Sequence, residues 1–244
     1  MSVTPAKISL IIVVRNAVST IEAAIQSIIS QDYPNFELVI IDGLSTDGTL
    51  EIIEKYSSDI AYFKSEKDEG IYDAMNKSIP HCSGDWIYFL GADDELYSDT
   101  VLTQLFSKPA QKTDIIYGNA YYTHRKKVRF GKVSRYMMSK HNINHQTIFY
   151  PKAVFQQYAF DLRYRVVADY YLNLQLFFKS EFHFKYLPIT VARFNDQGTS
   201  GVSADLQFDL DKAHIIKSIF PTDVYLFYKA RLLFTAIRDG LKSS

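Results

Sequence analysis

The chain has 244 residues and no net formal charge, and 47% of its residues are hydrophobic, 22% charged and 15% aromatic. This length fits one large α/β domain, or one domain with a helical appendage, and supplies enough apolar residues for a core. The zero net charge excludes a whole-chain field that favours nucleic acid or an anionic membrane, and the single cysteine, Cys82, excludes an internal disulfide and a cysteine-based metal cluster.

Residues 7–107 alternate short apolar strands with helices. Strands are expected at 8–14, 36–41, 60–63 and 86–90, where short apolar runs occur. Helices are expected at 19–29, 71–79 and 100–106, where apolar residues recur at helical spacing. A further helix is expected to begin after a cap at Thr46 or Asp47. Strands and helices that alternate with short connections predict a parallel sheet with helices on both faces.

The pattern changes after residue 107. We expect Tyr-rich strands within 114–128, a polar loop at 134–146, an apolar helix at 166–178, strands within 182–194, a Gly/Ser loop at 195–203 and two helices within 206–241. Residues 1–204 are therefore expected to form one domain, with halves at 1–107 and 108–204. Residues 205–244 are expected to form a C-terminal helical extension.

The first apolar run, at 8–14, lacks the length and the basic flank of a signal peptide, and no stretch reaches the roughly 20 apolar residues that span a bilayer. We therefore expect a cytoplasmic protein, either free or attached to the inner face of the membrane. Leu226, Ala230, Leu233 and Ile237 recur at helical spacing near basic residues in the tail. Residues 222–244 are thus a candidate for peripheral membrane contact. A helix packed on the domain or in a homodimer is the alternative.

Polar residues follow each strand of the first half: Arg15 and Asn16, then Asp42 and Gly43, then residues 67–70, then residues 91–94. In open parallel sheets, ligands bind outside these carboxyl ends. No glycine-rich phosphate loop and no Walker lysine are present, which argues against a nicotinamide dehydrogenase and a P-loop NTPase. An acidic edge binds a diphosphate only through a divalent cation, so this edge predicts a metal-dependent nucleotide diphosphate site. Each acid taken alone also fits a turn or helix cap.

Several segments resemble, in order, the motifs of family 2 glycosyltransferases, which have the GT-A fold. They are the donor-binding segment at 39–49, the following motif at 68–77, the D-x-D metal motif at 91–94, the pair His145 and Gln146, the catalytic-base segment at 167–170, and the stretch at 192–203. The pair His145 and Gln146 and the stretch at 192–203 resemble the colanic-acid-type enzymes that build bacterial surface polysaccharides. The resemblance implies an α/β fold of the GT-A type, with a mostly parallel sheet flanked by helices, a nucleotide-binding half at 1–107 and an acceptor half at 108–204.

The resemblance also implies an inverting transfer of a sugar from a nucleotide diphosphate to a saccharide or lipid-linked saccharide, with Mn²⁺ or Mg²⁺ as cofactor. Asp93 would bind the metal, and Asp169 would deprotonate the acceptor hydroxyl. The acceptor would meet His145 and Gln146. The donor would meet Asn16, Asp42, Ser45, Asp68, Asp73 and Asp94, with Asp42 against the base and Asp94 at the sugar.

Alternatives exist for individual residues. Asp169 also fits a helix N-cap that faces solvent, and Asp161 is its nearest rival as the base. His141 and His145 have the i, i+4 spacing of a helical metal site, but the asparagines between them disfavour a helix. Gly91 stands where the family often has the first D-x-D carboxylate, so the nucleotide is left open.

Two other functions compete with the transferase. A sugar-phosphate nucleotidyltransferase needs a basic, glycine-rich loop after the first strand, and residues 14–18 contain no glycine. A non-catalytic nucleotide-sugar-binding assembly protein would tolerate the loss of Asp93 or Asp169, and both acids are present. The transferase is therefore the favoured interpretation.

Overall fold

The computed structural model describes residues 5–107, 110–129, 131–197 and 205–240. The strands are β1 (Ile8–Val14), β2 (Phe36–Asp42), β3 (Ile60–Ser65), β4 (Trp86–Gly91), β5 (Glu95–Leu96), β6 (Asp114–Tyr122), β7 (Lys127–Arg129), β8 (Ile148–Pro151) and β9 (His183–Phe194). The helices are α1 (Ile21–Ile29), α2 (Thr49–Lys55), α3 (Ile71–Ser78), α4 (Val101–Phe106), α5 (Arg135–Met138), α6 (Val154–Gln157), α7 (Ala168–Lys179), α8 (Leu206–Ile219) and α9 (Thr222–Gly240), with short 3₁₀ turns η1 (Ile79–His81) and η2 (His145–Thr147).

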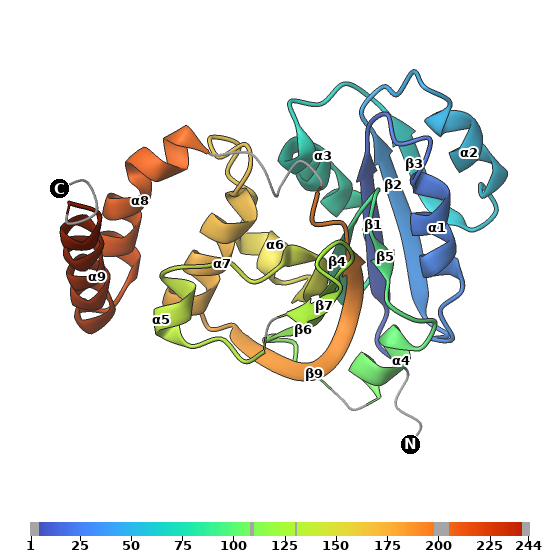
Figure 1. The fold of residues 1–244 in the computed structure, drawn as a ribbon. Coiled ribbons are helices and arrows are strands. Elements are labelled where there is room, and N and C mark those ends of the chain that lie inside the picture. Colours follow the sequence, from blue (N-terminus) through green and yellow to red (C-terminus); the bar gives the residue numbers. More distant parts are fainter. Residues whose placement is uncertain (1–4, 108–109, 130, 198–204, 241–244) are drawn as a thin grey trace.

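The first half is the parallel α/β unit that the apolar strand runs predict. Strand β1 pairs in parallel with β2 and β4, and β2 pairs in parallel with β3. Every residue of β1 is buried, because α1 and α2 cover one face of the sheet and α3 covers the other (Figure 1). Leu10 and Ile12 pack with α1, whereas Ile11 and Val13 pack with α3. The predicted α/β fold class is confirmed.

The second half extends the same sheet but reverses some strands. Among the described residues the order is β3-β2-β1-β4-β8-β6-β9-β5, with β7 paired to β6. Strand β8, which the sequence did not predict, runs antiparallel to both β4 and β6. The sheet is therefore mixed. The predicted loop at 134–146 was also partly wrong, since it contains α5 and the first residues of η2.

Strand β9 carries the chain back to the carboxyl edge of the first half. It is one long curved strand that runs parallel to β6 (Figure 1). Its last residues pair with β5, and Arg193 lies opposite Glu95. The residues that follow β9 therefore lie beside the loop after β4. The predicted loop at 195–203 lies largely outside the described residues, which end at Gln197 and resume at Asp205.

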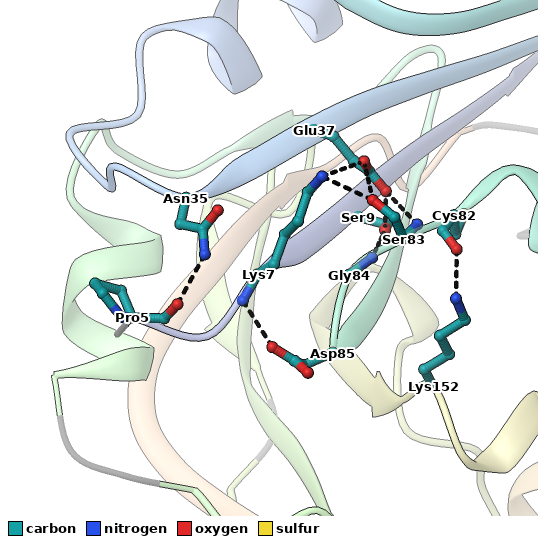
Figure 2. A network of polar contacts seen from close by, with 10 residues as sticks. All are labelled: Pro5, Lys7, Ser9, Asn35, Glu37, Cys82, Ser83, Gly84, Asp85 and Lys152. Atoms are coloured by element: carbon teal, nitrogen blue, oxygen red, sulfur yellow. Dashed lines mark hydrogen bonds and ion pairs between the residues drawn. The ribbon is translucent and has the colours of Figure 1, made fainter. Parts of the chain in front are cut away.

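The opposite, amino edge of the first half is held by a polar network around Glu37 (Figure 2). Its carboxylate accepts hydrogen bonds from Ser9 Oγ at 2.6 Å and from Ser83 Oγ at 2.6 Å, and it pairs with Lys7 Nζ at 2.7 Å. Burial alone would raise the pKa of Glu37, but these donors outweigh it and lower the pKa to about 2. Nearby, burial raises the pKa of the Cys82 thiol to about 12, so this side chain stays a neutral core group.

Helices α8 and α9 follow the second half and lie on its outer side, far from β1–β3 (Figure 1). Arg135 of α5 forms an ion pair with Asp223 at the start of α9, and Tyr136 packs edge-on against Phe227 with ring centroids 4.9 Å apart. The two predicted tail helices are thus present. None of the helices in the described part of the chain combines the length and apolar character that crossing a bilayer requires.

Candidate active site

Two adjacent pockets open at the carboxyl edge of the sheet. The first pocket has a volume of about 390 Å³ and is lined by the ends of β1 and β4, by η2 and by the segment after β9, including Arg15, Asn16, Gly91, Ala92, Asp93, Asp94, Gln146, Arg165 and Asn195. The second pocket, of about 340 Å³, is lined by residues of the acceptor half, including Tyr122, Arg125, Asn142, Asn144, Asp169 and Asp196. Both pockets share the side chains of Tyr72, His145, Val166 and Phe194 as a common wall.

Asn195, the residue after β9, holds the acidic pair of the first pocket. Its backbone N–H donates to Asp94 Oδ1 at 2.6 Å, and its side-chain amide donates to Asp93 Oδ2 at 2.9 Å. Asp94 is buried, and its desolvation, together with the negative charges of Asp93 and Glu95, raises its pKa well above the usual range. Asp93 is exposed on the pocket wall. The two neighbouring acids therefore differ in role, because only Asp93 offers a carboxylate to an incoming ligand.

Gly91 makes this arrangement sterically possible. A Cβ atom at this position would lie 2.5 Å from Asp94 Oδ2 and 2.7 Å from Gln146 Nε2. The Gly91 N–H also donates to Gln146 Oε1 at 2.9 Å. Asp94 and Gln146 thus fill the space that a side chain at residue 91 would take. This explains how the chain departs from the D-x-D pattern.

The acids of the first pocket fit a divalent cation only in part. Among the described residues, no three His, Cys, Asp or Glu side chains are arranged as a metal cluster. Mg²⁺ is commonly bound by one or two carboxylates together with substrate phosphates and water. The exposed carboxylate of Asp93 fits that donor set, with the remaining ligands supplied by a diphosphate.

Asp169 lies at the start of α7, in the wall of the second pocket. It is 7% exposed, so the interpretation as a solvent-facing helix cap is wrong. The Tyr72 hydroxyl donates to its Oδ1 at 2.8 Å, and the Asn142 amide donates to its Oδ2 at 2.5 Å. Asn142 is itself fixed by a hydrogen bond from Asn173 Nδ2 at 2.9 Å. The carboxylate is therefore surrounded by polar donors, whereas the sequence indicated an apolar setting.

His145 lies in the wall that the two pockets share. Its Nδ1 is 3.8 Å from Asp169 Oδ2, and its Nε2 is buried without a hydrogen-bond partner among the described residues. Burial lowers the pKa of His145, and the negative charges of Asp169 and Asp93 oppose this only in part. The imidazole is thus neutral near pH 7, with one nitrogen available to a ligand. His141 does not form a helical pair with it, because the segment between them is not helical, as its asparagines indicated.

Asp42 and Ser45 organise the loop after β2. Asp42 is fully buried, and its two oxygens accept hydrogen bonds from Ser45 Oγ at 2.5 Å and Ser65 Oγ at 2.6 Å. Ser45 Oγ in turn accepts from the Asn16 N–H at 2.8 Å. Asn16 has a positive φ of 53° and lines the first pocket. Of these three predicted donor contacts, only Asn16 is among the described residues that line the pocket.

Asp68 and Asp73 lie beside this edge but outside the described linings of both pockets. Asp68 Oδ1 accepts from the Gly70 N–H at 2.9 Å, and its other oxygen packs closely on Gly43. Asp73 forms an ion pair with Lys77 at 2.8 Å. The structure therefore gathers Asn16, Asp93, Asp94, His145 and Gln146 around the first pocket and Asp169 and His145 around the second.

Sequence reasoning missed four residues of this site. Tyr72 and Asn142 hold Asp169, Asn195 holds Asp93 and Asp94, and Arg165 adds a cation to the first pocket. Tyr72 stands inside the motif at 68–77 and Asn195 stands inside the stretch at 192–203, so these two segments were the available signals. Asn142 and Arg165 come from loops of the second half, where no motif marked them.

Sequence comparisons identify a family and relatives that this chain resembles. A family model described as "Glycosyl transferase family 2" matches residues 9–179. The chain is 34% identical over 210 residues to the PGL/p-HBAD biosynthesis glycosyltransferase of Mycobacterium bovis, which covers 82% of this chain and 81% of that protein.

Solved structures show the same fold. The S. aureus TarS in complex with UDP-GlcNAc has a TM-score of 0.68 at 18% identity, covering 87% of this chain and 65% of that one. The mannosyltransferase PcManGT from Pyrobaculum calidifontis, in complex with GDP-Man and Mn²⁺, has a TM-score of 0.62 at 17% identity, covering 97% of this chain and 78% of that one. Both likenesses confirm the predicted GT-A-like architecture.

Proposed function

The chain belongs to glycosyl transferase family 2, and we propose that it is an inverting enzyme that moves a sugar from a nucleotide diphosphate to a hydroxyl of a saccharide or lipid-linked saccharide. One observation carries the proposal. The pocket that contains Asp93 and the pocket that contains Asp169 share a wall, so a donor and an acceptor can meet at Tyr72 and His145.

The first pocket is the proposed donor site. Asp93, with Mn²⁺ or Mg²⁺, would hold the diphosphate, and the metal would neutralise the charge that develops on this leaving group. Arg15 and Arg165 line the same pocket and supply two further positive charges to the phosphates. The two similar structures, one in complex with UDP-GlcNAc and the other with GDP-Man and Mn²⁺, support a nucleotide sugar here.

The nucleotide base and the sugar would lie at opposite ends of this pocket. Asn16 lines the base end, and Ser45 and Asp42 fix the position of Asn16 through their hydrogen bonds. Asp68 and Asp73 would support the same end from behind. Asp94 would border the sugar, since it lines the pocket beside Asn195.

The second pocket is the proposed acceptor site. Asp169 would accept the proton of the acceptor hydroxyl as its oxygen bonds to the anomeric carbon. The bond from that carbon to the diphosphate breaks at the same time, so the nucleoside diphosphate leaves and the configuration inverts. Tyr72 and Asn142 would keep the carboxylate in position. His145 and Gln146 would border the acceptor from the shared wall.

The wider setting follows from the acceptor. We propose a role in bacterial polysaccharide synthesis in the cytoplasm, at the inner face of the membrane when the acceptor is lipid-linked. Residues 1–204 would carry catalysis, with a donor half at 1–107 and an acceptor half at 108–204. Residues 205–244 would form a separate helical extension.

A thermal-shift panel of nucleotide sugars, each with and without Mn²⁺, tests the donor site. A ligand at 100 times its dissociation constant adds about 2.7 kcal/mol of stability. The donor found in this way is then incubated with saccharide and lipid-linked acceptors, and release of the nucleoside diphosphate is measured. Metal-dependent binding without release in the presence of any acceptor would favour the alternative, a non-catalytic nucleotide-sugar-binding assembly protein.

A further inference from the structure

Helix α9 exposes its apolar side to solvent. Leu226, Phe227, Leu233, Phe234 and Ile237 are between 37% and 68% exposed. At 100° per residue these five side chains fall on one face of the helix, which we call the outer face. The opposite side of α9 carries the buried residues Val224 and Tyr228. Val224 and Tyr228 therefore anchor the helix, together with Phe227 at the margin of the outer face, whose ring packs on Tyr136 of α5. The rest of the outer face is left free to contact a partner.

Exposed cations flank the outer face. Lys229 and Arg231 stand on either side of it, and Lys140 Nζ lies 4.9 Å from the centre of the Phe227 ring. Within the described part of the chain, no carboxylate lies within 4.0 Å of these three basic groups. Met137 and Tyr136 of α5, both exposed, extend the apolar surface beside Lys140. The surface thus combines an apolar strip with positive charges that have no counter-ion among the described residues.

Basic side chains lie between the outer face and the segment that borders the second pocket. Lys140, Arg231 and Lys212 are close enough to His141 that their positive charges add to the effect of burial in lowering its pKa. His141 directly precedes Asn142, which holds Asp169 in the wall of the second pocket. A surface bound by the outer face would therefore lie on the acceptor side of the molecule, as the position of α9 in Figure 1 also shows.

We propose that the outer face of α9, with Lys229, Arg231 and Lys140, docks on a lipid bilayer that carries anionic headgroups. An apolar strip flanked by cations matches the boundary between acyl chains and anionic headgroups. A second copy of the chain fits less well, because a two-fold contact through this face would gather the same unpaired cations of both copies in one interface. Docking of this kind rests on the proposed function where it places a lipid-linked acceptor at the bilayer, whereas lipid binding itself needs no catalysis.

Sedimentation of the full-length chain with vesicles tests the inference. Vesicles of phosphatidylcholine alone are compared with vesicles that contain phosphatidylglycerol, at low and high salt. We expect binding only to the anionic vesicles, weakened by salt. The Leu233→Ser/Phe234→Ser variant should bind at least tenfold more weakly. Lys229→Gln should lower the binding constant about fivefold, the effect of one cation near an anionic surface.

A matched variant controls for the loss of exposed apolar surface in general. Leu206 and Leu210 of α8 are each 77% exposed and lie outside the outer face, so Leu206→Ser/Leu210→Ser should bind vesicles like the wild type. Circular dichroism and binding of nucleotide sugar verify that each variant is folded, independently of the lipid result.

Three results would overturn the inference. The first is no binding of the wild-type chain to anionic vesicles at low salt. The second is equal vesicle binding by Leu233→Ser/Phe234→Ser and the wild type. The third is a wild-type dimer in analytical ultracentrifugation that this variant dissociates, with no vesicle binding, which would assign the outer face to a second copy. A wild-type chain that binds anionic vesicles but shows no transferase activity would instead contradict the proposed function alone.

Discussion

The hydroxyl of Tyr72 donates a hydrogen bond of 2.8 Å to the carboxylate of Asp169, although 97 residues separate them. Tyr72 belongs to α3 in the first half of the chain, and Asp169 belongs to α7 in the second. Burial, and then the negative charge of Asp169, raise the pKa of Tyr72 well above its usual value. The hydroxyl therefore stays protonated at neutral pH and remains a donor, so the two halves of the site are joined directly.

Tyr72→Phe should lower turnover about tenfold, because the carboxylate of Asp169 loses one of the two donors that position it. The dissociation constant for the nucleotide sugar should stay within about twofold of the wild-type value, since the phenyl ring still forms the shared wall. Calorimetry measures donor binding, and single-turnover release of the nucleoside diphosphate measures turnover. Tyr56→Phe removes a hydroxyl bonded to Glu22 on the surface and serves as the control. Equal loss of activity in both variants would contradict a positioning role.

Asp169→Asn should reduce turnover by about 100-fold or more, because the amide has the same size but cannot accept the acceptor's proton. Donor binding should change little. Asp161→Asn is the matched control, since Asp161 is its nearest rival in sequence and pairs with Arg163 at 2.7 Å near the surface. Single-turnover release of the nucleoside diphosphate measures both variants. Near wild-type turnover in Asp169→Asn would show that another group is the base.

Asp93→Asn should abolish the metal-dependent part of donor binding, because Asp93 offers the exposed carboxylate of the first pocket. Titration calorimetry of the nucleoside diphosphate with Mn²⁺, and then with excess EDTA, measures this part. Asp59→Asn, at an exposed position before β3, should behave like the wild type. Wild-type binding that is the same with EDTA would rule out a metal at this pocket.

Gly91→Ala should weaken donor binding at least tenfold and lower the free energy of unfolding by about 1–3 kcal/mol. The added methyl would lie 2.5 Å from Asp94 Oδ2, so the buried carboxylate or the Gln146 amide must move. Denaturant titration and calorimetry measure the two effects. The control is Ala92→Ser, a small change at the next position in the pocket lining. A fully stable Gly91→Ala variant with unchanged donor binding would show that the loop accommodates the side chain freely.

Glu37→Gln should make the protein less sensitive to acid. The pKa of Glu37 is lowered to about 2 from a usual value of 4.5, so its stabilising effect is complete above pH 4.5 and is lost as the pH falls toward 2. This difference corresponds to about 3 kcal/mol at neutral pH. Thermal unfolding between pH 2 and pH 7 should show a smaller slope for Glu37→Gln than for the wild type. Glu51→Gln, on the exposed side of α2, should keep the wild-type slope.

The sequence by itself determined the first half of the fold and the edge of the sheet at which the site lies. Short apolar runs rich in β-branched residues, such as 8–14 and 36–41, favour strands buried on both faces, and parallel strands place their carboxyl ends together. The order of Asn16, Asp42 and Asp93 along the chain therefore predicted an acidic sheet edge. The spacing of apolar residues and the polar residues at the ends of strands are set by neighbours along the chain, so they can be predicted from the sequence.

Only the tertiary structure decided which of these residues face a ligand. Asp42 and Asp93 both follow buried strands, but Asp42 is closed off by Ser45 and Ser65, whereas Asp93 lies open in a pocket. Asp169 likewise has polar partners instead of an apolar setting, because Tyr72 and Asn142 reach it from distant segments. The contacts of Asp169 depend on how the second half of the chain packs against the first, and hydrogen bonds between residues far apart in sequence leave no periodic pattern along the chain.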